Sequence, residues 1–179
     1  MTEVVFHTGI ADKLGYTCRM LRKAYRQGVR VVVRGDPADL ARLDALLWTF
    51  EQLEFVPHAR LRPDESMKDT LARTPIWLVD EGAVAPQAAV LVNLGPHPVD
   101  RIDGYQRVIE IVGEEAADRQ AGRQRWRLYE RQGQAVTHVV PGVAVRDSQG
   151  RPDRGAAQDD ANVPAGLPVG GASPGEEAA

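Results

Sequence analysis

VRVVVRGDPADLARLDALLW, residues 29–48, is the stretch that decides the fold class of this chain. Residues 29–33 are β-branched except for Arg30, a composition typical of a buried strand. Asp36 stands where a helix N-cap is expected, and Pro37 stands at the first helical position, where proline's missing N–H costs nothing. Leucines at positions 40, 43 and 47 continue the helical spacing. The stretch therefore predicts a strand followed closely by a helix.

The residues before this stretch predict another strand and helix. Residues 4–7 form a β-branched and aromatic run that ends at Thr8-Gly9, and Asp12 stands in an N-cap position. Apolar residues recur at helical spacing through residues 13–27, and Gly28 ends that segment. The order strand, helix, strand, helix favours a right-handed crossover, which places the two strands side by side in a parallel sheet.

The remaining elements follow from apolar runs and the segments between them. Strands are predicted at residues 76–79, 88–94, 108–112 and 135–140, and a terminal helix at 115–132. Residues 50–61, 62–74 and 95–104 are predicted to be an aromatic-rich loop, a polar loop with a helical turn, and an irregular connection. We therefore expect an α/β fold: a single three-layer, Rossmann-like domain over residues 1–140, with a mostly parallel sheet flanked by helices.

Residues 141–179 differ in composition from the rest of the chain. They are rich in Pro, Gly, Ala, Asp and Glu, and they contain no aromatic residue and no periodicity. Such a segment cannot bury enough apolar surface to offset an ordering cost of about 1–2 kcal/mol per residue. We expect a disordered, acidic C-terminal tail.

The distribution of charge limits the function classes. The chain has a net charge of −3, and the tail holds three of its 22 Lys and Arg residues and six of its 25 Asp and Glu residues. Residues 1–140 are therefore neutral overall, which argues against strong direct binding to DNA.

Cysteine usage and hydropathy also limit the function classes. Cys18 is the only cysteine, so a disulfide within the chain and a zinc site built on thiolates are excluded. The N-terminus lacks a signal-peptide pattern, and no apolar run approaches the ~20 residues needed to span a bilayer. We expect a cytoplasmic protein with no membrane contact.

The motifs of a nucleotide-using enzyme are missing. A Rossmann site needs G-x-G-x-x-G after the first strand, where this chain has HTGIADKLGY, and no P-loop lysine motif occurs. Asp36 stands where a ribose-binding acid would, but Asp-Pro opening a helix is more simply a cap. The four histidines have no partner at metal-ligand spacing, and no nucleophile has a base positioned for it. We expect no cofactor, no metal and no catalytic residue; a small nucleotide-binding enzyme on a Rossmann-like fold is the alternative.

The terminal helix carries the first candidate binding surface. Within Glu115–Gly133, EAADRQAGRQRWRLYERQG, four residues fall on one stripe: Arg119, Arg123, Trp126 and Arg127. Ala117, Ala121 and Leu128 fall roughly opposite and are expected to pack on the domain. A cationic stripe with an aromatic residue in it, directly after a strand, predicts a shallow groove for an acidic ligand that ends in an apolar side chain.

Residues 47–58, LWTFEQLEFVPH, carry the second candidate surface. They place Trp48, Phe50 and Phe55 close together at a helix end. Aromatic residues dominate the binding energy of protein interfaces, so the cluster fits an interface hot spot. A core cluster beneath a loop fits it equally well.

These stretches carry a family resemblance. LDALLWTFEQLEFVPH and LVNLGPHPVDRIDGYQRVIEIVGEEAADRQAGRQRWRLYERQG, after the opening FHTGIADKLGYTCRMLRKAYRQGVRVVVRGDP, resemble the chi subunit of bacterial DNA polymerase III over about residues 1–140. The resemblance implies a nucleotide-binding type of fold without nucleotide, and a non-catalytic role. It implies a bridge from the clamp loader, through the psi subunit or another clamp-loader component, to the acidic C-terminal tail of single-stranded-DNA-binding protein, with DNA reached only indirectly.

Carried over by position, the family's tail pocket falls on Val112, Arg119, Arg123, Trp126 and Arg127, and its psi-facing surface on Trp48 and Phe55. This chain has Trp126 where the family commonly has tyrosine, and Gly113 where it often has proline. A helicase- or nuclease-associated scaffold is a further alternative that would share the pocket but not the Trp48/Phe55 surface. The acidic tail is itself a candidate for occluding the pocket, although it contains no phenylalanine.

Overall fold

The computed structural model describes residues 2–50, 55–65, 71 and 73–141, which form one α/β unit. The strands are β1 (Glu3–Ile10), β2 (Val31–Gly35), β3 (His58–Leu61), β4 (Ile76–Asp80), β5 (Val90–Asn93), β6 (Arg107–Gly113) and β7 (Ala135–Val139). The helices are α1 (Lys13–Arg26), α2 (Pro37–Thr49) and α3 (Ala116–Arg131).

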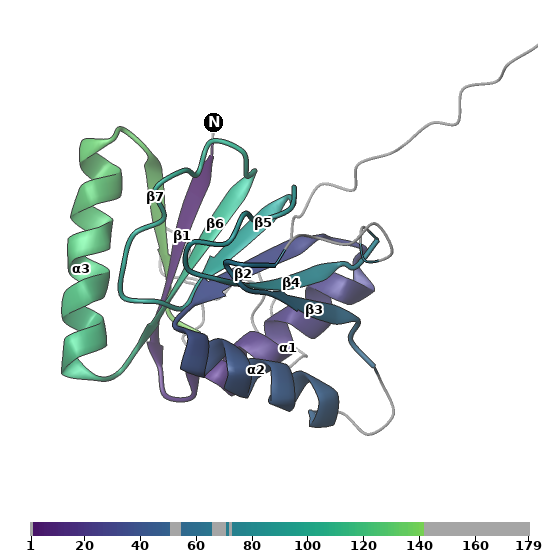
Figure 1. Ribbon diagram of the computed structural model, residues 1–179. Helices are drawn as coiled ribbons and strands as arrows, with labels where there is room; N and C mark the ends of the chain where they lie inside the picture. The colour runs from purple at the N-terminus through teal and green to yellow at the C-terminus, as the bar shows by residue number, and fades with distance from the viewer. Residues whose placement is uncertain (1, 51–54, 66–70, 72, 142–179) are drawn as a thin grey trace, which may run out of the picture.

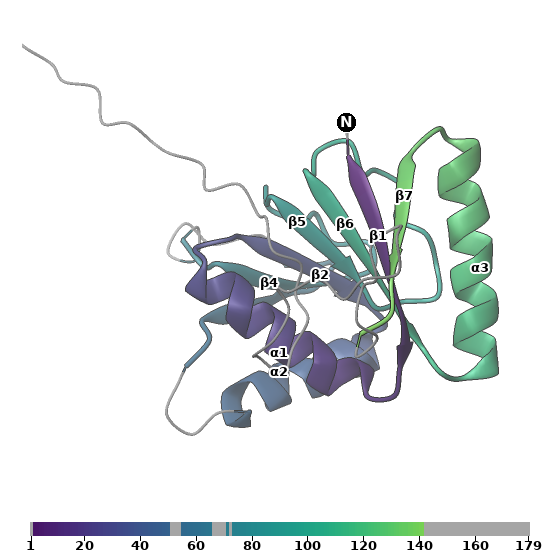
Figure 2. The ribbon, with the colours of Figure 1, turned by 180° about the vertical axis from the view of Figure 1, so that it is seen from behind.

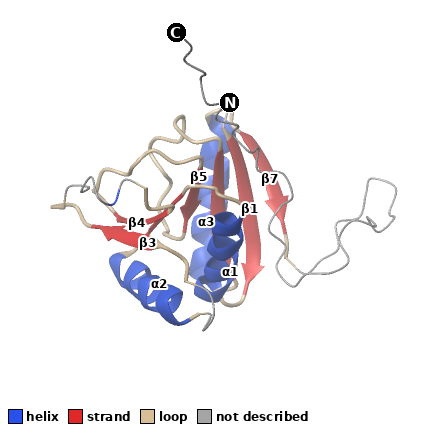
Figure 3. Cartoon of the chain, turned by 90° about the vertical axis from the view of Figure 1, so that its right-hand side faces the viewer, coloured by secondary structure: helices blue, strands red, loops and turns tan. Residues whose placement is uncertain are grey.

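The described strands form one parallel sheet in the order β3-β4-β2-β5-β6-β1-β7. Figure 1 shows α3 on one side of this sheet and α1 with α2 on the other, and the opposite view in Figure 2 shows the same separation. Figure 3, with helices and strands coloured separately, shows α1 and α2 on the near side of the sheet. The expected three-layer α/β fold is confirmed, and its sheet is parallel throughout the described strands.

The two hydrophobic cores explain why the strands are continuously apolar. In β2, Val31 and Val33 pack into the core on the α1 and α2 side, whereas Val32 packs into the core on the α3 side. Successive residues of a strand point to opposite faces, so a strand that is covered on both faces needs apolar residues at every position.

The local signals at the helix ends are partly realised. The Asp12 carboxylate accepts a 2.9 Å hydrogen bond from the Gly15 N–H and caps α1. Gly28 adopts φ +69° after that helix, a conformation that favours glycine. Asp36 is the N-cap residue of α2 and Pro37 begins the helix, but the Asp36 side chain makes no capping hydrogen bond.

Two sequence predictions are wrong. Residues 58–61 were expected in a loop, but they form the edge strand β3, which pairs with β4. Only Leu61 is buried in this short strand, so no apolar alternation marks it.

The second error concerns the face of the terminal helix that packs. Ala117 is exposed, and Ala121 and Leu128 are half-buried. The fully buried residues of α3 are Gly122, Arg125 and Tyr129. Apolar periodicity does not predict this face, because Arg125 is buried by its ion pair with the Glu110 carboxylate in the sheet.

Part of the expected helical turn in residues 62–74, and the predicted disorder of the tail from residue 142 on, lie outside the described residues.

Candidate functional site

The start of α3 is fixed by a shared carboxylate. Asp118 Oδ2 accepts hydrogen bonds from the Gly113 backbone N–H at 2.7 Å and from Lys13 Nζ at 2.8 Å. Lys13 Nζ also donates to the Leu94 carbonyl at 2.9 Å. These bonds join the end of β6, the start of α1 and the loop after β5 to the first turn of α3, so the helix is held in one position along the sheet.

A glycine brings the helix close to the sheet. A Cβ atom on Gly122 would lie 2.9 and 3.1 Å from the two methyl carbons of Val112, closer than such contacts normally allow. Val112 is only 3% exposed beneath this glycine. The predicted pocket residue Val112 therefore lies behind α3 and packs against the helix at Gly122.

A buried polar network sets the rotation of α3. Glu110 lies in the middle of β6, and both of its oxygens are bonded: Arg125 Nε donates to Oε2 at 2.8 Å and the Tyr129 hydroxyl donates to Oε1 at 2.8 Å. Asn93 Nδ2 lies 3.1 Å from both oxygens. Arg125 Nη1 also donates to the Pro96 carbonyl at 3.0 Å. The network joins α3 to β6, to β5 and to the loop that follows β5.

The electrostatics of this network follow from its burial. Glu110 is fully buried, and desolvation raises the pKa of its carboxyl group, an effect that the charge of Arg125 and the hydrogen bonds from Tyr129, Asn93 and Arg125 oppose. Burial and the neighbouring Glu110 raise the pKa of Tyr129 above its usual range. The sequence reasoning missed these residues, although the glutamate in the apolar run VIEIV and the four-residue spacing of Arg125 and Tyr129 were visible signals.

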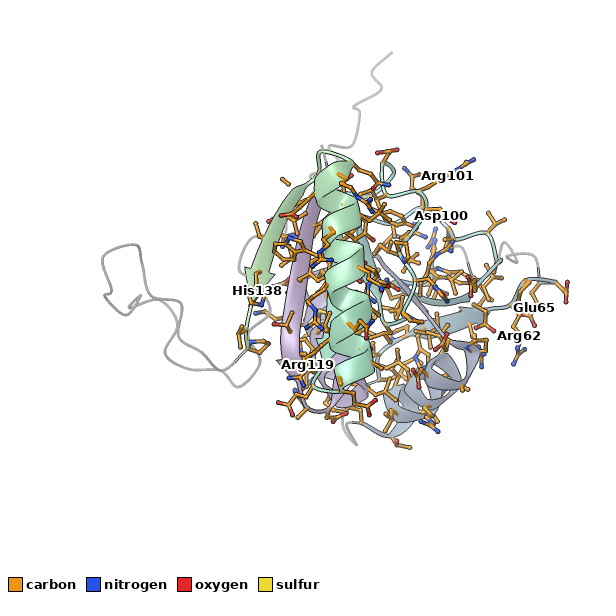
Figure 4. The ribbon with its side chains drawn as sticks, turned by 90° about the vertical axis from the view of Figure 1, so that its left-hand side faces the viewer. Arg62, Glu65, Asp100, Arg101, Arg119 and His138 are labelled. Carbon is orange, nitrogen blue, oxygen red and sulfur yellow. The ribbon has the colours of Figure 1, made fainter. Side chains whose placement is uncertain are left out.

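The opposite side of α3 presents the predicted cationic stripe. Arg119, Arg123 and Arg127 are all exposed, and within the described part of the chain none of their guanidinium groups makes an ion pair. Figure 4 shows Arg119 near the end of α3 where the helix begins. A shallow hollow over the second half of the helix is lined by Gln124, Arg127, Glu130 and Arg131.

Trp126 lies at the border between the stripe and the core. Its ring is partly buried, with its centroid 5.0 Å from that of Phe6 in β1 and 6.2 Å from that of His138 in β7. His138 Nε2 lies 2.6 Å from the Thr8 hydroxyl oxygen, which ties β7 to β1 on this side of the sheet. The structure thus brings Trp126 together with the three arginines on one surface, and β7 borders that surface.

The second predicted cluster divides between surface and core. Trp48 and Phe55 are 60% and 52% exposed, and their ring centroids lie 5.1 Å apart. Phe50 packs against the core instead. The His58 ring lies 5.2 Å from Trp48, and its Nδ1 donates to the Val56 carbonyl at 2.7 Å. Trp48 and Phe55 therefore form an exposed aromatic pair that packs against the His58 ring.

Metal ligands, membrane-spanning helices and a reactive cysteine are other features that could indicate a function within the described residues. Within them, no group of three His, Cys, Asp or Glu residues could hold a metal ion, and no helix is long and apolar enough to cross a membrane. Cys18 is fully buried, and burial raises the pKa of its thiol to about 11. At neutral pH that thiol is protonated and inaccessible, which does not suit a nucleophile.

The chain is similar to known proteins over most of its length. The model of the family described as "DNA polymerase III chi subunit, HolC" matches residues 1–137. A protein named DNA polymerase III subunit chi, from Pseudomonas aeruginosa, is 34% identical over 149 residues, which cover 80% of this chain and all of that protein. A Rickettsia prowazekii protein named probable DNA polymerase III subunit chi is 26% identical over 109 residues, covering 60% of this chain and 62% of that protein. The chain therefore belongs to the chi subunit family of DNA polymerase III, whose members are accessory subunits of the replicative polymerase.

Proposed function

We propose that this protein links the clamp loader, through psi, to the acidic C-terminal tail of single-stranded-DNA-binding protein in the cytoplasm, without catalysing a reaction itself. The observation that carries the proposal is the exposed stripe of Arg119, Arg123 and Arg127 beside the partly exposed Trp126. Like charges four residues apart on a helix repel each other by about 0.2–0.5 kcal/mol per pair, and an anionic partner would relieve this repulsion.

Each residue of the stripe has a defined part in binding such a tail. Arg123 pairs with the terminal carboxylate through a charge-assisted hydrogen bond worth ~1.5–3 kcal/mol. The terminal phenylalanine ring packs on Trp126, which lies in the helix that Val112 supports at Gly122, and burial of the ring contributes ~1.5–3 kcal/mol. Arg119 and Arg127 attract the acidic residues upstream, so association is fast and weakens with salt. After ordering costs, the affinity is on the order of micromolar, which suits a reversible tether.

The psi subunit is proposed to dock on Trp48 and Phe55. Two neighbouring aromatic side chains that are each more than half exposed are unfavourable in water and typical of interface anchors. They extend from α2 and the segment before β3, whereas the basic stripe lies on α3 across the sheet. Both partners can therefore bind at the same time, which a bridging subunit requires.

The tail site is tested with Arg123→Ala and a synthetic acidic peptide that ends in phenylalanine. Binding is measured by fluorescence anisotropy, and circular dichroism checks the fold. We expect a loss of affinity of at least tenfold. Arg42→Ala is the matched control, because Arg42 is an exposed arginine on α2, and it should bind as the unsubstituted protein does. Equal affinity of the two variants would reject the assignment.

The psi site is tested by co-purification with psi. Trp48→Ala combined with Phe55→Ala should abolish co-purification while leaving peptide binding unchanged. Val84→Ala is the control, because Val84 is 86% exposed and lies elsewhere on the surface. Retention of psi by the double variant would show that the psi surface lies elsewhere.

A further inference from the structure

We propose that residues 159–169 of this chain, DDANVPAGLPV, dock on the basic stripe of α3 and compete there with acidic ligands. The inference rests on the proposed function of the stripe, and it adds an internal regulator to the same site. The segment joins two adjacent carboxylates, Asp159 and Asp160, to the apolar residues Val163, Leu167 and Val169. These groups are complementary to the stripe, where guanidinium groups can pair with the carboxylates and the Trp126 indole can contact the apolar side chains.

Charge complementarity supports this occupant. Residues 155–179 contain four carboxylate side chains and no Lys or Arg. The exposed stripe carries Arg119, Arg123 and Arg127, whose guanidinium groups make no ion pair within the described residues. Residues 142–154 are less suited, because three arginines accompany Asp147 and Asp153 there.

The exit point of the chain brings the segment to the site. His138, near the end of β7, contacts Trp126, and Figure 4 shows His138 beside α3 toward the end that carries Arg119. The 19 residues from Pro141 to Asp159 can extend to ~60 Å. The 16 residues of α3 make a helix ~24 Å long, so the segment can reach any part of the stripe.

The segment lies beyond the part of this chain that the family model matches. The family match ends at residue 137, and the Pseudomonas protein is matched along its whole length by 80% of this chain. Tethering of this kind corresponds to effective concentrations on the order of 1 mM, so even a weak docking contact lowers the apparent affinity for another acidic ligand.

The test uses the full chain with two matched double variants. Asp159→Asn with Asp160→Asn removes the charged part of the proposed contact, and Asp147→Asn with Asp153→Asn removes the same charge elsewhere in residues 142–179. An acidic peptide ending in phenylalanine is the probe, measured by anisotropy at low and high salt. We expect the first variant to bind about two- to fivefold more tightly than the unsubstituted chain at low salt, the control to be unchanged, and the difference to vanish at high salt.

A second readout does not depend on the probe peptide. The indole N–H signal of Trp126 in a ¹H–¹⁵N spectrum should shift between the unsubstituted chain and the Asp159/Asp160 variant, at all protein concentrations, and not in the control. An unshifted indole signal with equal affinities overturns the inference, and so does a shift that disappears on dilution, which would mean contact between two copies. If the peptide binds neither chain while the indole signal still shifts, the proposed function fails and the internal contact stands.

Discussion

Replacing Arg125 by methionine is expected to destabilise the protein by about 3–5 kcal/mol, because it removes one partner of a buried ion pair and leaves Glu110 uncompensated. Arg125 is 1% exposed, and its guanidinium group bonds both Glu110 and the Pro96 carbonyl. The Tyr129 hydroxyl and the Asn93 amide would remain as donors to the carboxylate, but neither carries a charge. For a domain of this size the loss corresponds to a fall in Tm of about 6–20 °C.

The pH dependence of this loss has a definite sign. Burial raises the pKa of Glu110, and the positive charge of Arg125 opposes that rise. In Arg125→Met the folded-state pKa of Glu110 rises further above its unfolded value. Such a group contributes stability that is fully present below the unfolded pKa and is lost as the pH rises through the folded pKa. The variant should therefore lose stability more steeply than the unsubstituted protein as the pH rises above the unfolded pKa of Glu110.

Urea unfolding followed by circular dichroism at pH 5, 7 and 8 measures both effects. The double variant Glu110→Gln with Arg125→Met is the control, because a neutral amide in place of the carboxylate keeps partners for Tyr129 and Asn93. It should recover about 2–3 kcal/mol of the loss. A cost below about 1 kcal/mol, a double variant whose cost is the sum of the single costs, or parallel pH profiles would each refute the reasoning.

Three further predictions follow from the structure. Burial, with the charges of Arg107 and His138, lowers the pKa of His7 to about 4, so stability that is present above pH 6.5 is lost as the pH falls toward 4. The free energy of unfolding falls by about 3 kcal/mol over this pH range because of His7. In His7→Gln, the free energy of unfolding measured in urea should change less between pH 6.5 and pH 4. An unchanged slope in this range would contradict the prediction. Gly122→Ala should destabilise the fold by about 1–2 kcal/mol, because the new methyl group clashes with Val112. Adding Val112→Ala should relieve the clash but leave the cost of the lost valine side chain. Thermal unfolding should therefore show a cost for the double variant that is smaller than the sum of the two single costs. Trp48→Ala should change stability by less than about 1 kcal/mol because the side chain is 60% exposed, whereas Leu47→Ala, 3% exposed on the same helix, should cost about 2–5 kcal/mol. Similar losses at the two neighbouring positions would mean that Trp48 is part of the core.

Much of the fold was predictable because local chemistry and burial agree. The apolar runs at residues 76–79, 88–94 and 108–112 became central strands, since a parallel sheet covered on both faces needs apolar side chains at each position. Asp12, Gly28 and Pro37 marked helix ends through backbone requirements that act within a few residues. The edge strand β3 was not predictable in this way, because three of its four residues are only half-buried and its existence depends on pairing with β4.

The candidate site was predictable in one respect and not in another. Helical spacing alone places Arg119, Arg123, Trp126 and Arg127 on one stripe, and this geometry holds in the structure. What the stripe binds stays a prediction. That Val112 lies beneath the helix could not be foreseen, because the depth of α3 on the sheet depends on the contact at Gly122.

The sequence by itself determined the α/β class, the order of most elements and the spacing of charges along the last helix, because these depend on periodicity and on residues a few positions apart. The tertiary structure decided which way that helix faces. Arginine belongs at the surface by its own chemistry, and Arg125 is inside only because Glu110, 15 positions earlier, presents a buried carboxylate to it. That ion pair orients α3 so that Arg119, Arg123 and Arg127 face solvent. The orientation could not be predicted from residues close in sequence, because it depends on a contact between two separate elements.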